Sequence, residues 1–347
     1  MKIRTRRARI ALASTVVLPL VLAACGGGDS DDSGNGGGGG GSANEEVELT
    51  LAHSYTDQQP QHRCGAQVIA DEVADADVGL TIDIFGSSQL GGDADRISAV
   101  VSGDHDMDIQ GASALGAVYE PIGVVDAAYA FDDAAHLSEF FSGDASAELR
   151  ESFASETGVQ ILGAWSAGAR HFTANQPIRE PGDLEGLRMR FPNSPQFLMN
   201  AEALGATPTE VAFEELYLAL QQGIVDGQEN PITNIQAQNF LEVQSTLSLS
   251  GHQQNSNLVI IGPVWDELSE EQQEALSAAV ESAVSQVPDC VAEDEEKTLA
   301  EWQDSGDMEV VDDVDVEAFR SQADAYLREN FNEEQLAVYE AVRSEAE

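Results

Sequence analysis

Basic residues are scarce in this chain of 347 residues, and lysine is almost missing. Only Lys2 and Lys297 occur, and the 16 Lys and Arg residues face 62 Asp and Glu residues, for a formal net charge of −46. This balance argues against nucleic-acid binding, because phosphate contacts need a basic surface. Salt screening makes such self-repulsion tolerable, so the acidity indicates a saline habitat. A moderately acidic secreted protein from an ordinary habitat is the alternative.

Enzyme motifs are also missing. The sequence has no Gly-x-Ser-x-Gly, no Gly-x-x-x-x-Gly-Lys-Ser/Thr, no His-Glu-x-x-His and no Cys-x-x-Cys. His171 resembles a general base, but no nucleophile with an orienting partner lies near it in the sequence. Carboxylate pairs arise by chance in so acidic a chain and carry little information. We therefore expect no enzymatic activity, no cofactor and no metal site.

The N-terminal segment has the pattern of an export signal. Residues 1–24 combine a basic start with an apolar run from Ile10 to Ala24 that is short for a membrane span, which predicts a signal peptide. Its end, Leu22-Ala23-Ala24-Cys25, resembles a lipobox, in which Cys25 becomes the lipidated first residue of the mature protein. An ordinary secretion signal followed by an incidental cysteine is the alternative.

Residues 25–44 are rich in glycine, which predicts a flexible tether behind the lipidated cysteine. No later stretch is apolar enough to cross a bilayer, so acyl chains alone would hold the protein at the outer face of the cell membrane. The other two cysteines, Cys64 and Cys290, would lie in an oxidising compartment that permits a disulfide. Their pairing is a hypothesis, because the sequence does not give their separation in space.

Alternating and helical hydrophobic patterns predict a mixed α/β fold. The first part reads strand, helix, strand, helix, strand, which favours a mostly parallel sheet. The expected strands are 47–53, 80–85, 107–110, 158–165 and 258–261, and the expected helices are 61–75 and 93–102. A long helix begins at Ser269, which forms a capping box with Gln272, and runs to about Trp302. Pro288 should kink or divide it, and a last helical segment covers 315–344.

The segment 181–232 carries the most information. Arg188 and Arg190 alternate with apolar residues, which predicts a strand with both arginines on its polar face. Ser194-Pro195 starts a helix that Gly205 closes, and a second helix follows with Phe213, Leu216, Leu220 and Ile224 at helical spacing. A polar turn is expected at 226–231. The arginines therefore sit near element ends, where α/β folds form ligand sites.

Four motifs in this segment resemble the substrate-binding proteins of TRAP transporters, the DctP-like family. They are Leu187–Asn193, Gly205–Pro208, Ala212–Tyr217 and Asp226–Pro231, and they fall in order at the expected spacing. Weaker similarity, including 88–91 and 168–170, extends from about Val47 to near the C-terminus.

The resemblance implies a periplasmic-binding-protein-like fold of two α/β domains around a hinged cleft, with the long helix as a brace across both. Domain I would hold 45–167 plus 256–295, and domain II would hold 168–255 plus 296–347. It also implies a function, which is the capture of an organic anion and its delivery to membrane permease subunits. Two alternatives remain: a sensor module that docks on a membrane receptor kinase, and a secreted hydrolase.

The resemblance also suggests ligand-binding residues. Arg190 stands where the family's arginine binds the substrate carboxylate, although the motif here reads Arg-Phe-Pro, where many relatives carry valine. A guanidinium matches a carboxylate edge to edge. Arg170 matches a second ligand arginine, with an interdomain salt bridge as its alternative. Asn230 matches the family's orienting amide, with a turn residue as its alternative. Arg188 should share the polar face of Arg190, but alternation can equally leave it at the rim, and we do not expect it to be a ligand.

The remaining candidates rest on weaker matches. Phe213 corresponds to an aromatic residue that lines the cleft, and Tyr217 follows on the same helical face. His53, Gln89 and Gln110 lie at strand ends of domain I. Two arginines favour a C4-dicarboxylate, although a 2-oxo acid, a sugar acid or an aromatic acid would use Arg190 equally well. Ectoine ranks lower, because Arg188 and Thr209 stand where its aromatic walls are wanted.

Overall fold

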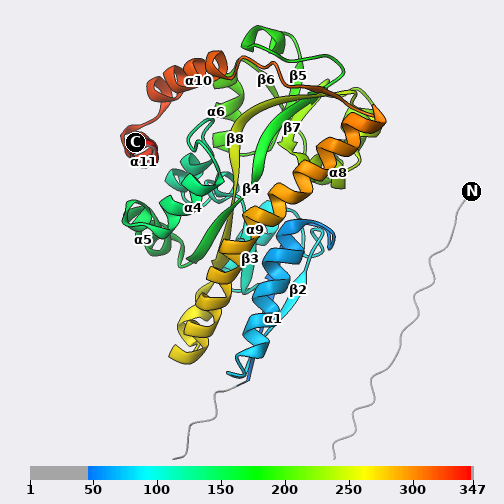
Figure 1. Cartoon of the computed structure of the whole chain (residues 1–347). Helices are drawn as coiled ribbons and strands as arrows, with labels where there is room; N and C mark the ends of the chain where they lie inside the picture. The colour runs from blue at the N-terminus through cyan, green and yellow to red at the C-terminus, as the bar shows by residue number, and fades with distance from the viewer. Residues whose placement is uncertain (1–45, 345–347) are drawn as a thin grey trace, which may run out of the picture. The chain divides into compact units, whose positions relative to one another are not determined.

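The computed structural model describes residues 46–344. The expected signal peptide, Cys25 and the Gly-rich tether lie outside these residues. The described residues form one mixed sheet with the strand order β2-β1-β3-β8-β4-β7-β5-β6, and β9 pairs with β8 (Figure 1). The predicted division into two domains and its boundaries stay a prediction. No helix of residues 46–344 has the length and apolar character needed to cross a membrane.

The first part of the chain confirms the predicted βαβαβ order. Strand β1 (Val47–Ala52) pairs in parallel with β2 (Leu80–Phe85) and with β3 (Met107–Gln110). The connections carry the π-helix η1 (Gln61–Ala66) with α1 (Gln67–Asp75), and then α2 (Asp93–Ser102). Helix α2 ends where predicted because Gly103 takes up a left-handed conformation, with φ of 79°, that glycine adopts without strain.

Two long antiparallel strands run through the centre of the sheet (Figure 1). They are β4 (Gln160–Ala174) and β8 (Thr246–Ile261), whereas the sequence predicted strands only at 158–165 and 258–261. The register of the pair shifts at three places, between Ile161 and Gly163, between Ser166 and Ala169, and between Arg170 and Phe172. These bulges break the two-residue alternation, so the pattern in the sequence marks only part of each strand.

The segment around the two arginines forms the other end of the sheet. Strand β5 (Arg188–Phe191) leads into α6 (Pro195–Leu204), whose Ser194 cap accepts from the Phe197 amide and whose end is Gly205 with φ of 90°, as predicted. The next elements are β6 (Thr207–Glu210), the 3₁₀ helix η5 (Phe213–Glu215) and α7 (Leu216–Gln221). The predicted second helix is shorter than expected. Helix α7 ends at Gln221, so Ile224 lies beyond it and is 50% exposed.

The expected polar turn at 226–231 was wrong, because Gly227–Pro231 is a fully buried strand, β7, between β4 and β5. Its polar side chains are satisfied by partners from other strands. Gln228 donates to the Thr173 hydroxyl at 2.9 Å, for example. Gly227 is required by packing, since a Cβ there would lie 2.5 Å from the Thr173 carbonyl oxygen.

Helix α9 (Glu270–Ser305) is one undivided helix of 36 residues that lies across β4 and beside α1 (Figure 1). The capping box of Ser269 and Gln272 is confirmed. Pro288 does not divide the helix, because buried residues on both sides of it, Val287 and Val291, pack into the core. A proline removes one helical hydrogen bond, which this packing outweighs.

The predicted final helix is two helices, α10 (Val316–Asn330) and α11 (Glu333–Ser344), after the short strand β9 (Glu309–Val311). The break arises at Asn332, whose side chain accepts from the Gln335 amide at 2.9 Å while Gln335 accepts from the Asn332 amide at 3.0 Å. This reciprocal pair is a capping box that starts α11. The further elements are α3 (Ala112–Leu115), η2 (Glu120–Asp126), α4 (Ala134–Ser142), η3 (Asp144–Ser146), α5 (Ala147–Thr157), η4 (Pro181–Leu184), α8 (Ile232–Ala237), η6 (Phe240–Glu242) and η7 (Pro263–Glu267).

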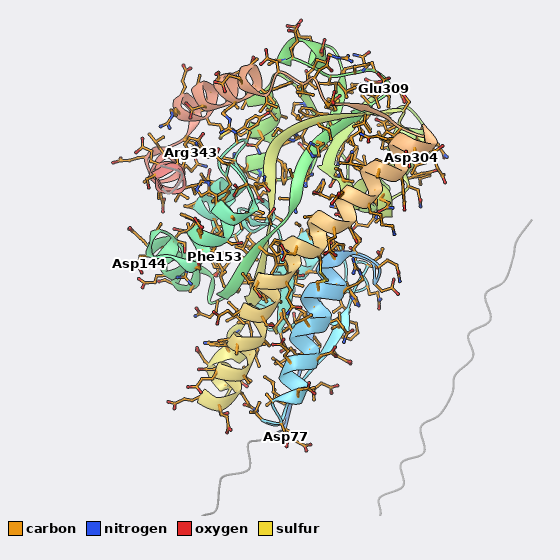
Figure 2. The ribbon with its side chains drawn as sticks, in the orientation of Figure 1. Asp77, Asp144, Phe153, Asp304, Glu309 and Arg343 are labelled. Atoms are coloured by element: carbon orange, nitrogen blue, oxygen red, sulfur yellow. A yellow bond between two sulfur atoms is a disulfide. The ribbon has the colours of Figure 1, made fainter. Side chains whose placement is uncertain are left out.

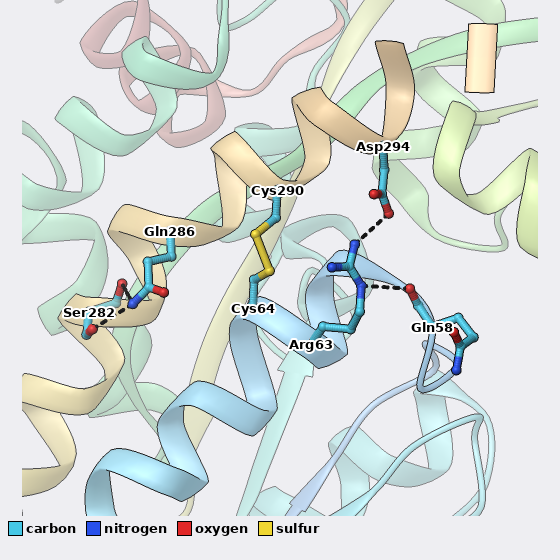
Figure 3. The surroundings of a disulfide bond; sticks show 7 residues. All are labelled: Gln58, Arg63, Cys64, Ser282, Gln286, Cys290 and Asp294. Carbon is cyan, nitrogen blue, oxygen red and sulfur yellow. Dashed lines mark hydrogen bonds and ion pairs between the residues drawn. A yellow bond between two sulfur atoms is a disulfide. The ribbon is translucent and has the colours of Figure 1, made fainter. Parts of the chain in front are cut away.

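Cys64 and Cys290 form a disulfide, which confirms the hypothesis of their pairing (Figure 3). The bond joins η1 to α9, with Cα atoms 6.6 Å apart. Beside it, Arg63 pairs with Asp294 at 2.7 Å, so the same two helices are held by an ion pair as well. The acidic residues lie mostly on the outside, as Asp77, Asp144 and Asp304 illustrate in Figure 2.

Candidate functional site

A cavity of about 550 Å³ lies beside the sheet. Its lining includes residues within the central strands β4 and β8 and residues at or near the ends of β1, β3, β5 and β7. The sheet places these strands side by side, although they are far apart in the sequence. The side chains that the following paragraphs use are Tyr55 after β1, Gln110 at the end of β3, Arg170 in β4, Arg190 in β5, Phe213 in η5, Asn230 in β7, and Asn255 and Asn257 in β8.

Arg190 is a buried cation without an internal counter-ion. Its side chain is 3% exposed, and its Nε donates to the Val211 carbonyl at 2.9 Å. Among residues 46–344, no carboxylate oxygen lies within 4.0 Å of its guanidinium. Burial lowers the pKa of Arg190 to about 10, so the group stays charged at neutral pH. A charge in this position needs a partner, and residues 46–344 supply none in contact with it.

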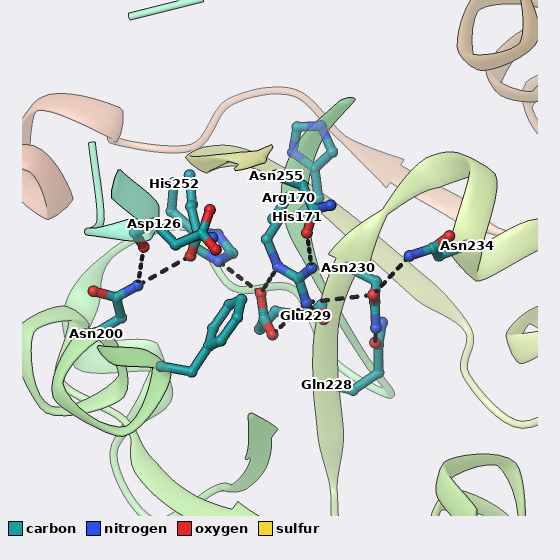
Figure 4. Close-up of polar contacts among 12 residues, drawn as sticks. Asp126, Arg170, His171, Asn200, Gln228, Glu229, Asn230, Asn234, His252 and Asn255 are labelled. Atoms are coloured by element: carbon teal, nitrogen blue, oxygen red, sulfur yellow. Dashed lines mark hydrogen bonds and ion pairs between the residues drawn. The ribbon is translucent and has the colours of Figure 1, made fainter. Parts of the chain in front are cut away.

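Arg170, in contrast, is already paired. Its Nε and Nη2 bind the two carboxylate oxygens of Glu229, Nη2 also donates to the Glu229 carbonyl at 2.8 Å, and Nη1 donates to Asn255 (Figure 4). The guanidinium also lies over the Phe197 ring at 4.8 Å. Although burial opposes it, the charge of Arg170 lowers the pKa of Glu229, so this carboxyl is ionised. The pair therefore has no net charge.

His252 completes this cluster from β8. Burial lowers its pKa, so the imidazole is neutral, and its Nε2 lies 3.2 Å from the Glu229 carboxylate. Because an ionised carboxylate only accepts, Nε2 must carry the hydrogen, and Nδ1 accepts from the Ser250 hydroxyl at 2.8 Å. Although Ser250, His252 and Glu229 are the residue types of a catalytic triad, each is 0% exposed, so no substrate reaches the serine.

Asn230 lines the cavity and is held on both sides. Its carbonyl oxygen accepts from Arg170 at 3.3 Å and from Asn234 at 3.2 Å, and its amide donates to Gln228 at 2.6 Å (Figure 4). The other hydrogen of this amide has no acceptor within residues 46–344 and is available to a ligand. Gln110 and Phe213 also line the cavity. The structure thus brings together five of the eight predicted residues, namely Arg170, Arg190, Phe213, Gln110 and Asn230.

The other three predicted residues lie away from the cavity wall. Gln89 is exposed, and the hydroxyl of Tyr217 donates to Glu242 at 2.6 Å on the surface. His53 is fully buried, and burial lowers its pKa to about 3. Its Nδ1 accepts from the Tyr55 amide at 3.1 Å, so the neutral ring carries its hydrogen on Nε2, which faces His62 at 3.1 Å. His53 therefore supports Tyr55, which does line the cavity.

Sequence reasoning did not find Tyr55, Asn255 and Asn257. The two asparagines sit two positions apart on β8, which places both on the same face of the strand. The alternation Asn255-Ser256-Asn257, directly before the apolar residues 258–261, could have indicated a polar face on this strand. In residues 46–344 no group of three His, Cys, Asp or Glu side chains could hold a metal ion. The arrangement can bind an anion through Arg190 and hydrogen-bond a polar body through amides and a phenol.

Comparisons with known proteins identify the family of this chain. Residues 51–334 match the profile of the family described as bacterial extracellular solute-binding protein, family 7. A solute-binding protein of Roseobacter denitrificans is 31% identical over 306 residues, covering 87% of this chain and 92% of the relative. A similar structure is the crystal structure of a TRAP periplasmic solute binding protein from that species with bound L-galactonate. The match has a TM-score of 0.79 and 30% sequence identity, and it covers 87% of this chain and 99% of that one.

Two further relatives show the range of ligands. The 2,3-diketo-L-gulonate-binding periplasmic protein of Escherichia coli is 32% identical over 254 residues, covering 73% of this chain and 77% of the relative. The structure of a TRAP periplasmic solute binding protein from Sulfurospirillum deleyianum with bound succinate has a TM-score of 0.78 and 26% identity, covering 86% and 99% of the two chains. These matches confirm the predicted family, its mixed α/β fold with a long helix, and its role as a binding protein and not an enzyme. The chain belongs to family 7 of the bacterial extracellular solute-binding proteins, the extracytoplasmic receptors of TRAP transporters.

Proposed function

We propose that Arg190 binds the carboxylate of an organic anion, which this receptor delivers to TRAP permease subunits. The proposal rests on Arg190, whose buried guanidinium has one backbone acceptor and no carboxylate in contact among the residues that the structure describes. A ligand carboxylate would supply the missing charge and accept hydrogen bonds from the free nitrogens. Hydrogen bonds to charged groups contribute about 1.5–3 kcal/mol each, and more in a site that excludes water.

The pairing of Arg170 with Glu229 decides how many carboxylates the cavity favours. The C4-dicarboxylate expectation assumed two free arginines, but Glu229 neutralises Arg170, which leaves Arg190 as the single uncompensated cation among the described cavity residues. Asp93 and Glu214 also line the cavity, and a second ligand carboxylate near them would be repelled. We therefore propose a monocarboxylate as the preferred ligand, with a C4-dicarboxylate as the alternative.

Contacts between distant segments, each involving one residue that lines the cavity, support capture between two parts of the chain. Gln59, after β1, donates to Asn234 of α8 at 2.8 Å, and Ser88, after β2, donates to Glu214 of η5 at 3.0 Å. Such contacts would hold the cavity closed around a ligand and exclude water, which strengthens the ionic contact. Delivery to permease subunits is the family's function. Lipidation of Cys25 is a further proposal, supported by the lipobox-like sequence and the tether.

The test is binding of carboxylates by the exported protein, purified in high salt, with thermal unfolding and calorimetry as readouts. A ligand at a hundredfold excess over its Kd should stabilise the protein by about 2.7 kcal/mol. Arg190→Ala should abolish binding. Arg188→Ala is the matched control, because Arg188 lies on the same strand but is exposed and paired with Asp226 at 2.6 Å.

Two results would contradict the proposal in different ways. Binding that survives in Arg190→Ala would show that the carboxylate is held elsewhere. A second result is binding that depends on Arg190 but is tighter for dicarboxylates than for monocarboxylates of equal length. This result would support the receptor function and overturn the proposed preference for a monocarboxylate. Within residues 46–344 no specific observation favours kinase docking or hydrolysis.

A further inference from the structure

We infer that Tyr55 and Asn257 form a hydroxyl-recognition pair in the cavity, and that the ligand is therefore a hydroxylated monocarboxylate. This inference rests on the proposed function, because it uses the same cavity and assumes a carboxylate at Arg190. It adds residues for the other end of the ligand, which the family comparison does not assign.

The two side chains come from different elements and meet at the cavity wall. Tyr55 follows β1, and Asn257 lies in β8. The Asn257 amide donates to the Tyr55 hydroxyl oxygen at 2.7 Å and to the Ser256 carbonyl at 3.0 Å, so both of its hydrogens are used. Among residues 46–344 its carbonyl oxygen has no hydrogen-bond partner, although the oxygen is buried and the residue is only 1% exposed. Buried acceptors of this kind normally have a partner, so an unpaired acceptor belongs to a residue that lines the cavity.

The Tyr55 hydroxyl supplies the complementary group. Its oxygen accepts from Asn257, but its own hydrogen has no acceptor among residues 46–344. Burial raises the pKa of Tyr55 to about 12, so the hydroxyl keeps this hydrogen at any physiological pH and remains a donor. The pair therefore offers one unused donor and one unused acceptor.

This combination selects for a particular chemical group. A carboxylate can only accept and an ammonium group can only donate, so each would satisfy one member of the pair and leave the other unmatched. An alcohol both donates and accepts, so one or two hydroxyls of a ligand can satisfy both members. The open carbonyl oxygen of Asn257 also disfavours a second carboxylate at this place.

The backbone around Tyr55 fixes the pair before a ligand arrives. The Tyr55 amide donates to the buried ring of His53 at 3.1 Å, and the Tyr55 carbonyl accepts from the Ser87 amide at 2.8 Å. On β8, Asn255 lies two positions before Asn257 on the same face and accepts from Arg170. Preorganised groups lose little conformational freedom on binding, which favours selectivity. His53 therefore acts as a positioning residue for Tyr55.

The test compares acids that differ only in hydroxyl groups. Calorimetry would measure the affinity of the exported protein for L-galactonate and other aldonates of four to six carbons, and for the unsubstituted acids of the same lengths. Sites that hydrogen-bond a ligand hydroxyl discriminate strongly against analogues without it. We expect aldonates to bind at least tenfold more tightly. Tyr55→Phe, which removes one oxygen, should lower aldonate affinity at least tenfold and leave the unsubstituted acids within twofold.

Controls separate this result from a folding defect. Tyr217→Phe is the matched control, since Tyr217 makes its hydrogen bond outside the cavity, and it should bind like the wild type. Asn257→Ala is a second variant that removes the open acceptor, and the midpoint of thermal unfolding reports whether each variant is folded. Its selectivity for aldonates should fall as in Tyr55→Phe.

The outcomes also distinguish this inference from the proposed function. The hydroxyl pair would be overturned if the wild type bound aldonates and unsubstituted acids equally well, or if Tyr55→Phe weakened both equally. If binding still depended on Arg190, the proposed receptor function would stand. Binding of every acid unchanged in Arg190→Ala would overturn the proposed function instead. A folded wild-type protein that binds no acid in this panel would overturn both.

Discussion

Arg170 of β4 and Glu229 of β7 satisfy each other within the cavity wall, while Arg190 on the next strand, β5, has no such partner. The sequence predicted a ligand-binding role for both arginines, yet their electrostatic states differ. One belongs to a neutral internal pair, and the other is a buried cation that is open to a ligand. The difference depends on Glu229, which the neighbouring strand places within contact of only one of them.

The first prediction concerns Glu229→Gln. Removing the counter-ion leaves Arg170 as an uncompensated buried charge, so we expect a loss of about 3–5 kcal/mol in the free energy of unfolding, measured by urea unfolding in high salt. Asp226→Asn is the control, since it breaks an ion pair with Arg188 that is exposed and should cost less than about 1 kcal/mol. In the folded variant, affinity for dicarboxylates should rise relative to monocarboxylates. Equal costs for the two substitutions would contradict this account.

The second prediction concerns the disulfide between Cys64 and Cys290. The two residues are 226 positions apart, so the bond restricts a very long loop of the unfolded chain, and its loss should cost about 2–5 kcal/mol. A reductant should lower the Tm of the wild type. The double variant Cys64→Ser/Cys290→Ser should start at the lower Tm and not respond to the reductant. An unchanged Tm in protein whose two thiols are shown to be free would speak against this stabilisation.

The third prediction concerns the pH dependence of stability. Glu295 of α9 has one carboxylate oxygen buried without a partner, and burial raises its pKa from 4.5 to about 8. Between these values the folded protein binds a proton that the unfolded chain has released, so stability falls as pH rises from about 4.5 to 8. At about 1.4 kcal/mol for each pH unit, the contribution is at most about 5 kcal/mol.

Glu295→Gln keeps the shape of the side chain and cannot ionise. We therefore expect the variant to be more stable than the wild type above pH 8, and the gap between them to close toward pH 5, as measured by thermal unfolding across this range. Glu293→Gln, an exposed position on the same helix, should follow the wild-type curve. Parallel curves for wild type and Glu295→Gln would show that folding does not raise the pKa of Glu295.

The sequence was sufficient to predict those elements whose structure depends on residues close by in the chain. Helix α6 could be placed because Ser194 and Gly205 act on their own backbone, and the early βαβαβ unit followed from alternation. The segment 226–231 could not be placed in this way. Gln228, Glu229 and Asn230 are polar and resemble a turn, and they are buried only because Thr173, Arg170 and His252 supply partners from other strands.

The candidate site shows the same limit. Arg190 and Asn230 were found from motifs, whereas the neutral state of Arg170 depends on a contact with Glu229 that no local pattern reveals. His53 was expected to face the ligand, because it ends a strand at the correct edge of the sheet. The structure turns it inward, where it supports the backbone of Tyr55. Distinguishing the two roles required the contacts of His53 with Tyr55 and His62.

The position of β8 in the sheet has a consequence for the order of assembly. This strand lies between β3 and β4, yet it follows both in the sequence by more than 70 residues. A chain that has emerged only as far as β7 can form two smaller sheets, and each then presents an unpaired edge strand, which is prone to pairing with other chains. Completion of the fold therefore waits for the last third of the chain, so we expect truncation before Thr246 to yield aggregates instead of a stable partial fold.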